Sequence, residues 1–62
     1  MKDITINVTF TDAEAWQYAQ FLKRVGFADY QEKATSQEGA YTMVAAGEKL
    51  REALREHGYS PR

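Results

Sequence analysis

Residues 3–14 read Asp-Ile-Thr-Ile-Asn-Val-Thr-Phe-Thr-Asp-Ala-Glu, and this stretch decides the expected fold. Its first eight residues alternate polar and apolar side chains and are rich in β-branched types, which is typical of a strand with one buried face. The apolar members are Ile4, Ile6, Val8 and Phe10. Thr11 and Glu14 then have the spacing of a capping box, which begins a helix. The stretch predicts an N-terminal strand over about 3–10 that runs directly into a helix.

The residues after this junction have the three-to-four-residue spacing of amphipathic helices. A first helix is predicted at about 12–25, with Gly26 as its left-handed C-terminal cap. A short second helix is predicted at 28–34. The large aromatic residues of this region are expected mainly in the core. They are Trp16, Phe21, Phe27 and Tyr30.

A third helix is predicted at 37–57. Thr35 and Glu38 repeat the capping-box spacing at its start, and Gly58 and Pro61 supply the signals that end a helix. Tyr59 is expected to pack back on Leu54, the contact that usually accompanies a glycine cap.

An alternative for residues 40–45 stays open, because Ala-Tyr-Thr-Met-Val-Ala lies between two glycines and contains residues favoured in strands. This segment is then a second, antiparallel strand, and the last helix is shortened to 47–57. The choice matters because a lone strand needs a partner edge. If 40–45 is a strand, the first strand has a mate in its own chain; if it is helical, the mate must come from another chain. In either case the predicted fold class is α+β, an N-terminal strand packed by amphipathic helices.

Length and charge restrict the function. The 62 residues allow one small domain, and eight Lys and Arg against nine Asp and Glu give a net charge of −1. The chain has no cysteine and no apolar run of the roughly 20 residues that a membrane helix needs. We expect a cytoplasmic protein without a membrane partner, either a monomer or a homodimer.

The reactive side chains do not form a recognisable catalytic set. His57 is the single histidine, and it stands beside the glycine that ends the last helix, where a cation interacts favourably with the helix dipole. No histidine pair has metal-ligand spacing, and neither serine lies in a nucleophile motif. The sequence predicts a protein that is not an enzyme and has no metal or cofactor.

The order of strand, helix and helix resembles the ribbon-helix-helix DNA-binding proteins. In that family two chains pair their N-terminal strands and insert the ribbon into the major groove. The resemblance implies that Thr5, Asn7 and Thr9 face the bases in a dimeric transcriptional regulator. The overall negative charge and the single lysine of the strand, Lys2, disfavour direct nucleic-acid binding.

Acidic residues dominate the middle of the chain and offer a different binding surface. They are Asp12, Glu14, Asp29, Glu32 and Glu38. Such a surface is complementary to a basic, DNA-binding protein surface, and charge complementarity selects partners. Several of these carboxylates also stand where they are expected to cap helices.

The segments Phe-Leu-Lys-Arg-Val-Gly-Phe-Ala-Asp-Tyr at 21–30 and Gly-Tyr-Ser-Pro-Arg at 58–62 resemble a family of short proteins encoded by phages and plasmids of proteobacteria. In size and character the chain is similar to anti-CRISPR proteins. That similarity implies a stoichiometric inhibitor that binds a Cas effector complex and blocks target DNA recognition. The expected partner is then a Cas subunit with a basic DNA-binding surface, contacted by the five acidic residues.

Overall fold

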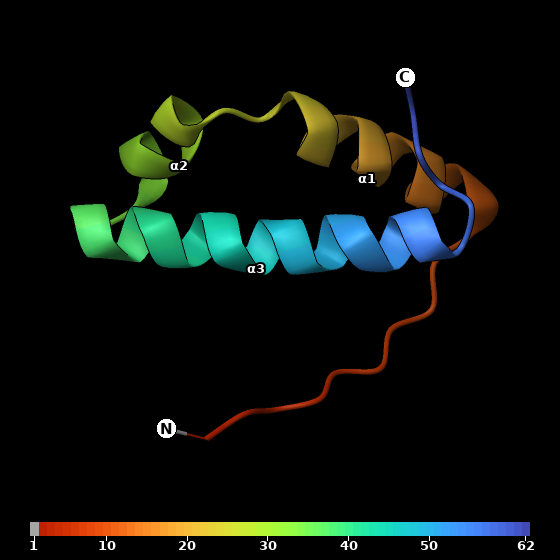
Figure 1. The fold of residues 1–62 in the computed structure, drawn as a ribbon, viewed down its shortest axis with the longest axis horizontal. Helices are drawn as coiled ribbons and strands as arrows, with labels where there is room; N and C mark the ends of the chain where they lie inside the picture. The colour runs from red at the N-terminus through yellow and green to blue at the C-terminus, as the bar shows by residue number, and fades with distance from the viewer. Residues whose placement is uncertain (1) are drawn as a thin grey trace.

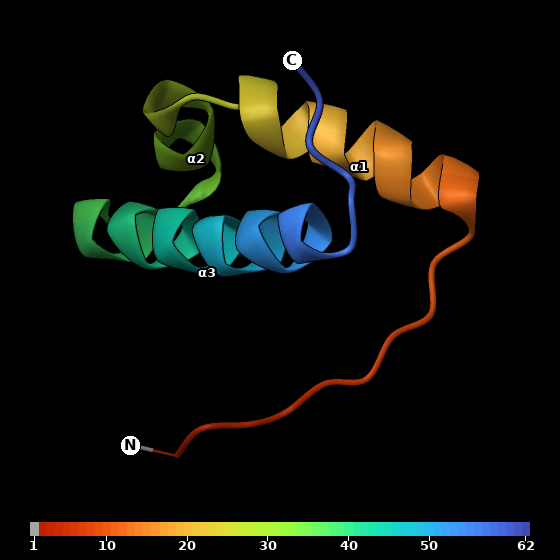
Figure 2. The ribbon, with the colours of Figure 1, turned by 45° about the vertical axis from the view of Figure 1, so that its right-hand side comes forward.

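The computed structural model describes residues 2–62 as three helices in the order α1 (Asp12–Arg24), α2 (Phe27–Lys33) and α3 (Gln37–Glu56). In Figure 1, α1 and α2 lie one after the other along the same side of the long helix α3. Both of them pack against α3, so α3 is the common support of the domain. Residues 2–10 form an extended segment that leaves the start of α1 and runs below α3, clear of the helices in both views (Figures 1 and 2).

The predicted α+β class is wrong, because residues 2–62 contain no strand. The expected strand over 3–10 is extended but pairs with nothing. The alternative second strand at 40–45 lies inside α3. The alternation of polar and apolar residues shows only which side chains would share a face. A strand also needs a neighbouring strand for its backbone N–H and C=O groups. Since 40–45 is helical, the part of the chain described here offers no such neighbour.

Local hydrogen bonds fix where the helices begin. The capping box at Thr11 is confirmed: the Glu14 backbone N–H donates to Thr11 Oγ1 at 3.1 Å, and the Thr11 N–H donates to Glu14 Oε1 at 2.8 Å. Helix α3 is capped by Ser36 and not by Thr35, since the Gly39 N–H donates to Ser36 Oγ at 2.9 Å. Each predicted helix is present, and none of its ends differs from the expected one by more than one residue.

The predicted role of Gly26 is wrong. Its φ of −102° is not left-handed, and it stands at the N-terminus of α2 instead of capping α1. The chain leaves α1 through Val25 in an extended conformation, and the Gly26 N–H donates to Asp29 Oδ2 at 2.9 Å. The predicted cap at Gly58 is confirmed. Gly58 has a φ of 95°, and the Tyr59 N–H donates to the Leu54 carbonyl at 2.9 Å, closing the end of α3.

The core is small and is made largely of short side chains on α1. Ala15, Ala19 and Leu22 of α1 are buried together with Leu54 of α3, and Tyr59 packs against this cluster as expected. The core of the described residues therefore holds few large buried side chains.

A second contact joins α2 to α3 through Tyr30 and Gly47. A methyl group added at Gly47 would overlap the Tyr30 hydroxyl and lie 3.4 Å from Tyr30 Cζ and 3.8 Å from Leu22 Cδ2. The Tyr30 hydroxyl thus occupies the space that a side chain at position 47 would fill. The rings of Phe27 and Tyr41 also lie 4.9 Å apart, which adds an aromatic contact between α2 and α3.

Candidate functional site

The first candidate element is the extended segment of residues 2–11, called the arm below. Every residue of the arm is exposed, including the four with apolar side chains. Ile4 and Ile6 are 76% and 71% exposed. A row of exposed apolar side chains on a soluble protein is typical of an interaction surface. Thr5, Asn7 and Thr9 alternate with these apolar residues and are also exposed. The arm therefore offers an apolar side, a polar side and two unpaired backbone edges.

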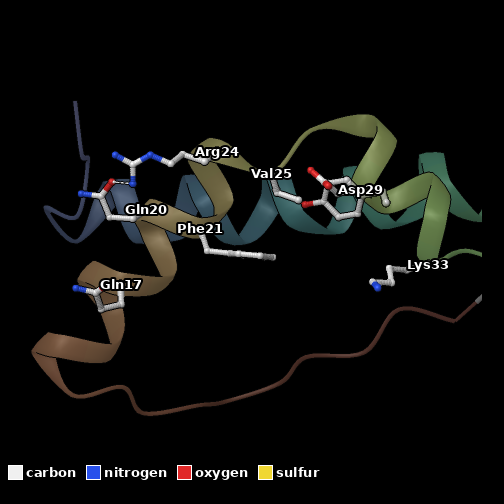
Figure 3. Close-up of a pocket in the computed structure, with 8 residues that line it drawn as sticks. Gln17, Gln20, Phe21, Arg24, Val25, Asp29 and Lys33 are labelled. Atoms are coloured by element: carbon white, nitrogen blue, oxygen red, sulfur yellow. Dashed lines mark hydrogen bonds between the residues drawn. The ribbon is translucent and has the colours of Figure 1, made fainter.

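The second candidate element is a concave surface between α1 and α2, called the α1–α2 groove below. Its volume is about 750 Å³, and it is lined by Gln17, Gln20, Phe21, Arg24, Val25, Asp29, Tyr30 and Lys33 (Figure 3). The Phe21 side chain extends from α1 into the middle of this surface (Figure 3) and is 52% exposed.

The polar groups of the groove lie around its apolar centre. Arg24 Nη1 donates to Gln20 Oε1 at 2.6 Å, a bond drawn in Figure 3, and Asp29 is held by the Gly26 N–H. Phe21 also stacks on Tyr18, with ring centroids 5.4 Å apart and planes inclined by 26°. The groove itself thus combines the rings of Phe21 and Tyr30 with polar and charged side chains.

A third feature ties the C-terminal end of the chain to the start of α1. The Tyr59 hydroxyl donates to Asp12 Oδ1 at 2.7 Å, and the Tyr59 ring meets Trp16 edge-on, with centroids 5.1 Å apart. The bond to Asp12 raises the pKa of the Tyr59 hydroxyl, because loss of its proton would remove the donor and place a negative charge beside a carboxylate. These three residues stabilise the position from which the arm departs.

A model for a family of unknown function (DUF7706) matches residues 1–62, the whole sequence. The chain belongs to the DUF7706 family. Neither a curated protein nor a solved structure matches this DUF7706 chain.

The five acidic residues of the DUF7706 chain are not brought together into one patch. Asp12 and Glu14 lie at the start of α1, whereas Asp29 and Glu32 on α2 and Glu38 at the start of α3 lie at the opposite end of the helical body (Figure 1). Asp12, Glu14 and Asp29 each accept a hydrogen bond within the domain. Glu32 lies 3.7 Å from Lys33 as a solvated ion pair.

The aromatic residues were predicted mainly as core, and this is wrong for three of them. Trp16, Phe21 and Phe27 are all exposed over a third or more of their surface. The helical pattern places them beside the apolar stripe of their helix, but the stripe that is buried on α1 is narrow and consists of Ala15, Ala19 and Leu22. The sequence analysis also missed the bond between Asp12 and Tyr59, which joins residues 47 positions apart. The available signal was Asp12, an aspartate at the first position of the helix whose side chain takes no part in the capping box.

The remaining reactive groups lie apart from one another in the DUF7706 chain. His57 Nδ1 lies 2.9 Å from the Ala53 carbonyl oxygen at the end of α3, a bond within its own helix end. Within residues 2–62, no group of three His, Asp or Glu side chains is arranged to hold a metal ion. Across the same residues, none of the helices combines the length and the apolar character of a membrane span.

Proposed function

We propose that the protein is a homodimer that pairs its N-terminal arms into a two-stranded ribbon and binds DNA through the polar side of that ribbon. One observation carries the proposal: the arm has the alternation of a strand, is exposed on both sides, and has no mate because residues 40–45 belong to α3. A second copy supplies an identical edge, and antiparallel pairing of two identical strands is the symmetric solution.

The energetics favour pairing of the arms together with burial of their apolar side. Full burial of a Val, Ile or Phe side chain contributes about 1.5–3 kcal/mol. A dimer has eight apolar arm side chains, four from each copy. Weighted by their exposed fractions, their burial contributes about 8–15 kcal/mol. Association costs about 4–15 kcal/mol. The gain and the cost are of the same size, so pairing of the arms requires that the apolar side of the ribbon is covered as well.

The polar side of the ribbon has suitable chemistry for base recognition. Thr5, Asn7 and Thr9 carry hydroxyl and amide groups that hydrogen-bond to base edges in the major groove, which admits a two-stranded ribbon. Lys2 is the one lysine in each arm, so the dimer makes few phosphate contacts from the ribbon itself. Two such contacts predict a slope of log K against log salt of only about −2. We also propose a cytoplasmic location in a bacterium, the compartment in which a DNA-binding protein meets its target.

The test has two parts. Analytical ultracentrifugation of the full chain should give a dimer, and Ile6→Asp should give a monomer. Selection from a random duplex DNA library should enrich one sequence for the unmodified protein, and Asn7→Ala should weaken that binding at least tenfold without changing the dimer. A monomer at all concentrations overturns the ribbon. A dimer that enriches no sequence overturns the DNA target alone.

A second candidate function is inhibition of a Cas effector complex. The observation that favours it is the position of Asp29, Glu32 and Glu38, which lie on α2 and the adjacent start of α3 at one end of the domain. An acidic end of this kind suits a basic DNA-binding surface. Glu32→Lys combined with Glu38→Lys should abolish co-purification with a Cas complex, whereas the same double change should leave ribbon-mediated DNA binding intact. Neither Glu32 nor Glu38 caps a helix through its side chain, so the double variant should fold.

A further inference from the structure

The α1–α2 groove runs in the direction in which the arm of the same chain extends. Four of its residues form a stripe along the axis of α1: Gln17, Gln20, Phe21 and Arg24. The arm turns back at the start of α1 and extends toward the end of the domain that holds α2 (Figures 1 and 2). We propose that the arm docks into the groove of its own chain, with Ile6 on Phe21 and Ile4 beside Val25.

The spacing of residues sets the apolar side chains of the arm level with those of the groove. A helix rises about 1.5 Å per residue, so Phe21 lies about 15 Å along α1 from Thr11. An extended chain rises about 3.3 Å per residue, so Ile6 reaches about 16 Å from Thr11. By the same count, Val25 lies at about 21 Å and Ile4 reaches about 23 Å. The two apolar pairs therefore match without any shift of the chain.

The movement that docks the arm leaves the start of α1 intact. Both hydrogen bonds of the capping box join Thr11 to Glu14, and neither involves an earlier residue. Rotation about the backbone dihedrals of Phe10 moves residues 2–9 while the Thr11 amide keeps its place. Within the part of the chain that the structure describes, no hydrogen bond holds residues 2–10 to the helices. Docking thus breaks no hydrogen bond.

Docking covers apolar surface on both the arm and the groove. Ile4, Ile6 and Phe21 are each more than half exposed while the arm is undocked. Removing apolar side chains from water is favourable. The polar side of the arm stays turned outward, because successive side chains of an extended chain point to opposite sides.

The arm of the same chain is favoured over a separate molecule because it is tethered beside the groove. A segment joined to its site by a short linker has an effective concentration in the millimolar range. A second copy would have to reach a comparable concentration to displace it. The inference goes beyond the proposed ribbon, since docking takes place within one chain. It also supplies the cover that the apolar side of a ribbon requires.

A disulfide engineered within one chain tests the docking, because the natural chain has no cysteine. Ile4→Cys is combined with Arg24→Cys, which leaves the contact of Ile6 with Phe21 in place. Positions 4 and 24 are both exposed, so neither change removes core packing. The protein is oxidised mildly in dilute solution. Mass spectrometry of the intact protein distinguishes a disulfide within one chain from one that links two chains.

Matched controls separate docking from chance encounters of a tethered arm. Asp3→Cys and Thr5→Cys, each combined with Arg24→Cys, close rings of nearly the same size from the polar side of the arm. Phe21→Ala added to the Ile4→Cys protein removes the central apolar contact of the groove. Tyr41→Ala added in its place removes an equally exposed aromatic ring that does not line the groove.

We expect the Ile4→Cys protein to form at least fivefold more of the intrachain disulfide than either polar-side control. Phe21→Ala should lower its yield to the control level, and Tyr41→Ala should leave it unchanged. Equal yields from the three arm positions, or a yield that ignores Phe21→Ala, would overturn the docking. Disulfides formed mainly between chains would also overturn it. Sedimentation tests the ribbon separately: a monomer that forms the intrachain disulfide as expected would overturn the ribbon and support the docking.

Discussion

At the contact between Tyr30 and Gly47, the Tyr30 hydroxyl oxygen decides whether an alanine at position 47 raises or lowers the free energy of unfolding. Gly→Ala in a helix interior normally stabilises a protein by about 1 kcal/mol, because alanine has the higher helix propensity. In α3 the new methyl group at position 47 overlaps the Tyr30 hydroxyl. Overpacking of this kind costs about 1–3 kcal/mol. We expect Gly47→Ala to lower the free energy of unfolding by about 1 kcal/mol, in place of the usual gain.

Removing the hydroxyl should reverse this result. In the Tyr30→Phe background the methyl group of Gly47→Ala lies 3.4 Å from the ring carbon Cζ and 3.8 Å from Leu22 Cδ2, both ordinary packing distances. Gly47→Ala should then stabilise the protein by about 1 kcal/mol, so the double-mutant cycle should give a coupling of about 2 kcal/mol. For a domain of this size, 1 kcal/mol corresponds to about 4–8 °C in Tm.

Thermal and urea unfolding followed by circular dichroism measure all four proteins of the cycle. Ala45→Gly, at an exposed position of the same helix, calibrates the propensity term and should cost about 1 kcal/mol. The reasoning fails if Gly47→Ala is equally stabilising with and without the Tyr30 hydroxyl, because the packing of α2 on α3 would then not be as described.

Three further predictions concern the helix cap, the C-terminal contact and the arm. Ser36→Ala should destabilise the protein by about 1 kcal/mol in urea unfolding, while Thr35→Ala should change little; the opposite order would assign the cap to Thr35. The pKa of Tyr59 is raised above its ordinary value of 10, so the protonated form is favoured by folding. Its stabilising contribution is complete below pH 10 and is lost as the pH rises through the higher, folded-state pKa. Trp16 fluorescence should report this loss in strong base, and Tyr59→Phe should remove the transition; a transition of unchanged size would mean that Asp12 does not hold the tyrosine. Val8→Asp should abolish any dimer seen by sedimentation while leaving the helical circular dichroism per residue unchanged, and loss of helix would show instead that the arm is needed for folding of the monomer.

The helices were predictable because their signals are local. The capping box of Thr11 with Glu14 is made of hydrogen bonds between residues three positions apart. The helix end at Gly58 uses bonds that span three to five residues, so the partners of every bond are close together in the sequence. Gly26 shows the limit of such signals. A glycine after a helix is compatible with ending that helix or beginning the next one, and the choice was decided by Asp29, which accepts the Gly26 N–H.

The fold class was not predictable from the arm, because alternation reports where side chains point and not what the backbone pairs with. Residues 40–45 decided the matter, and there the helical stripe and the Ser36 cap outweighed the strand preferences of Tyr41 and Val44. The candidate site was missed for a related reason. The groove joins Phe21 and Tyr30 from two helices whose relative position depends on Gly47, and no pattern within either helix reveals that arrangement.

The contact of Tyr59 with Asp12 has a consequence for how the arm transmits a binding event. Tyr59 is held to the end of α3 by its backbone, to α1 by its hydroxyl and to Trp16 by its ring. The arm therefore begins at the point where α1 and the C-terminal end of α3 are joined. Ordering of the arm by any ligand should slow amide hydrogen exchange at the C-terminal end of α3 as well as in α1, so that two helices respond to the capture of ten residues.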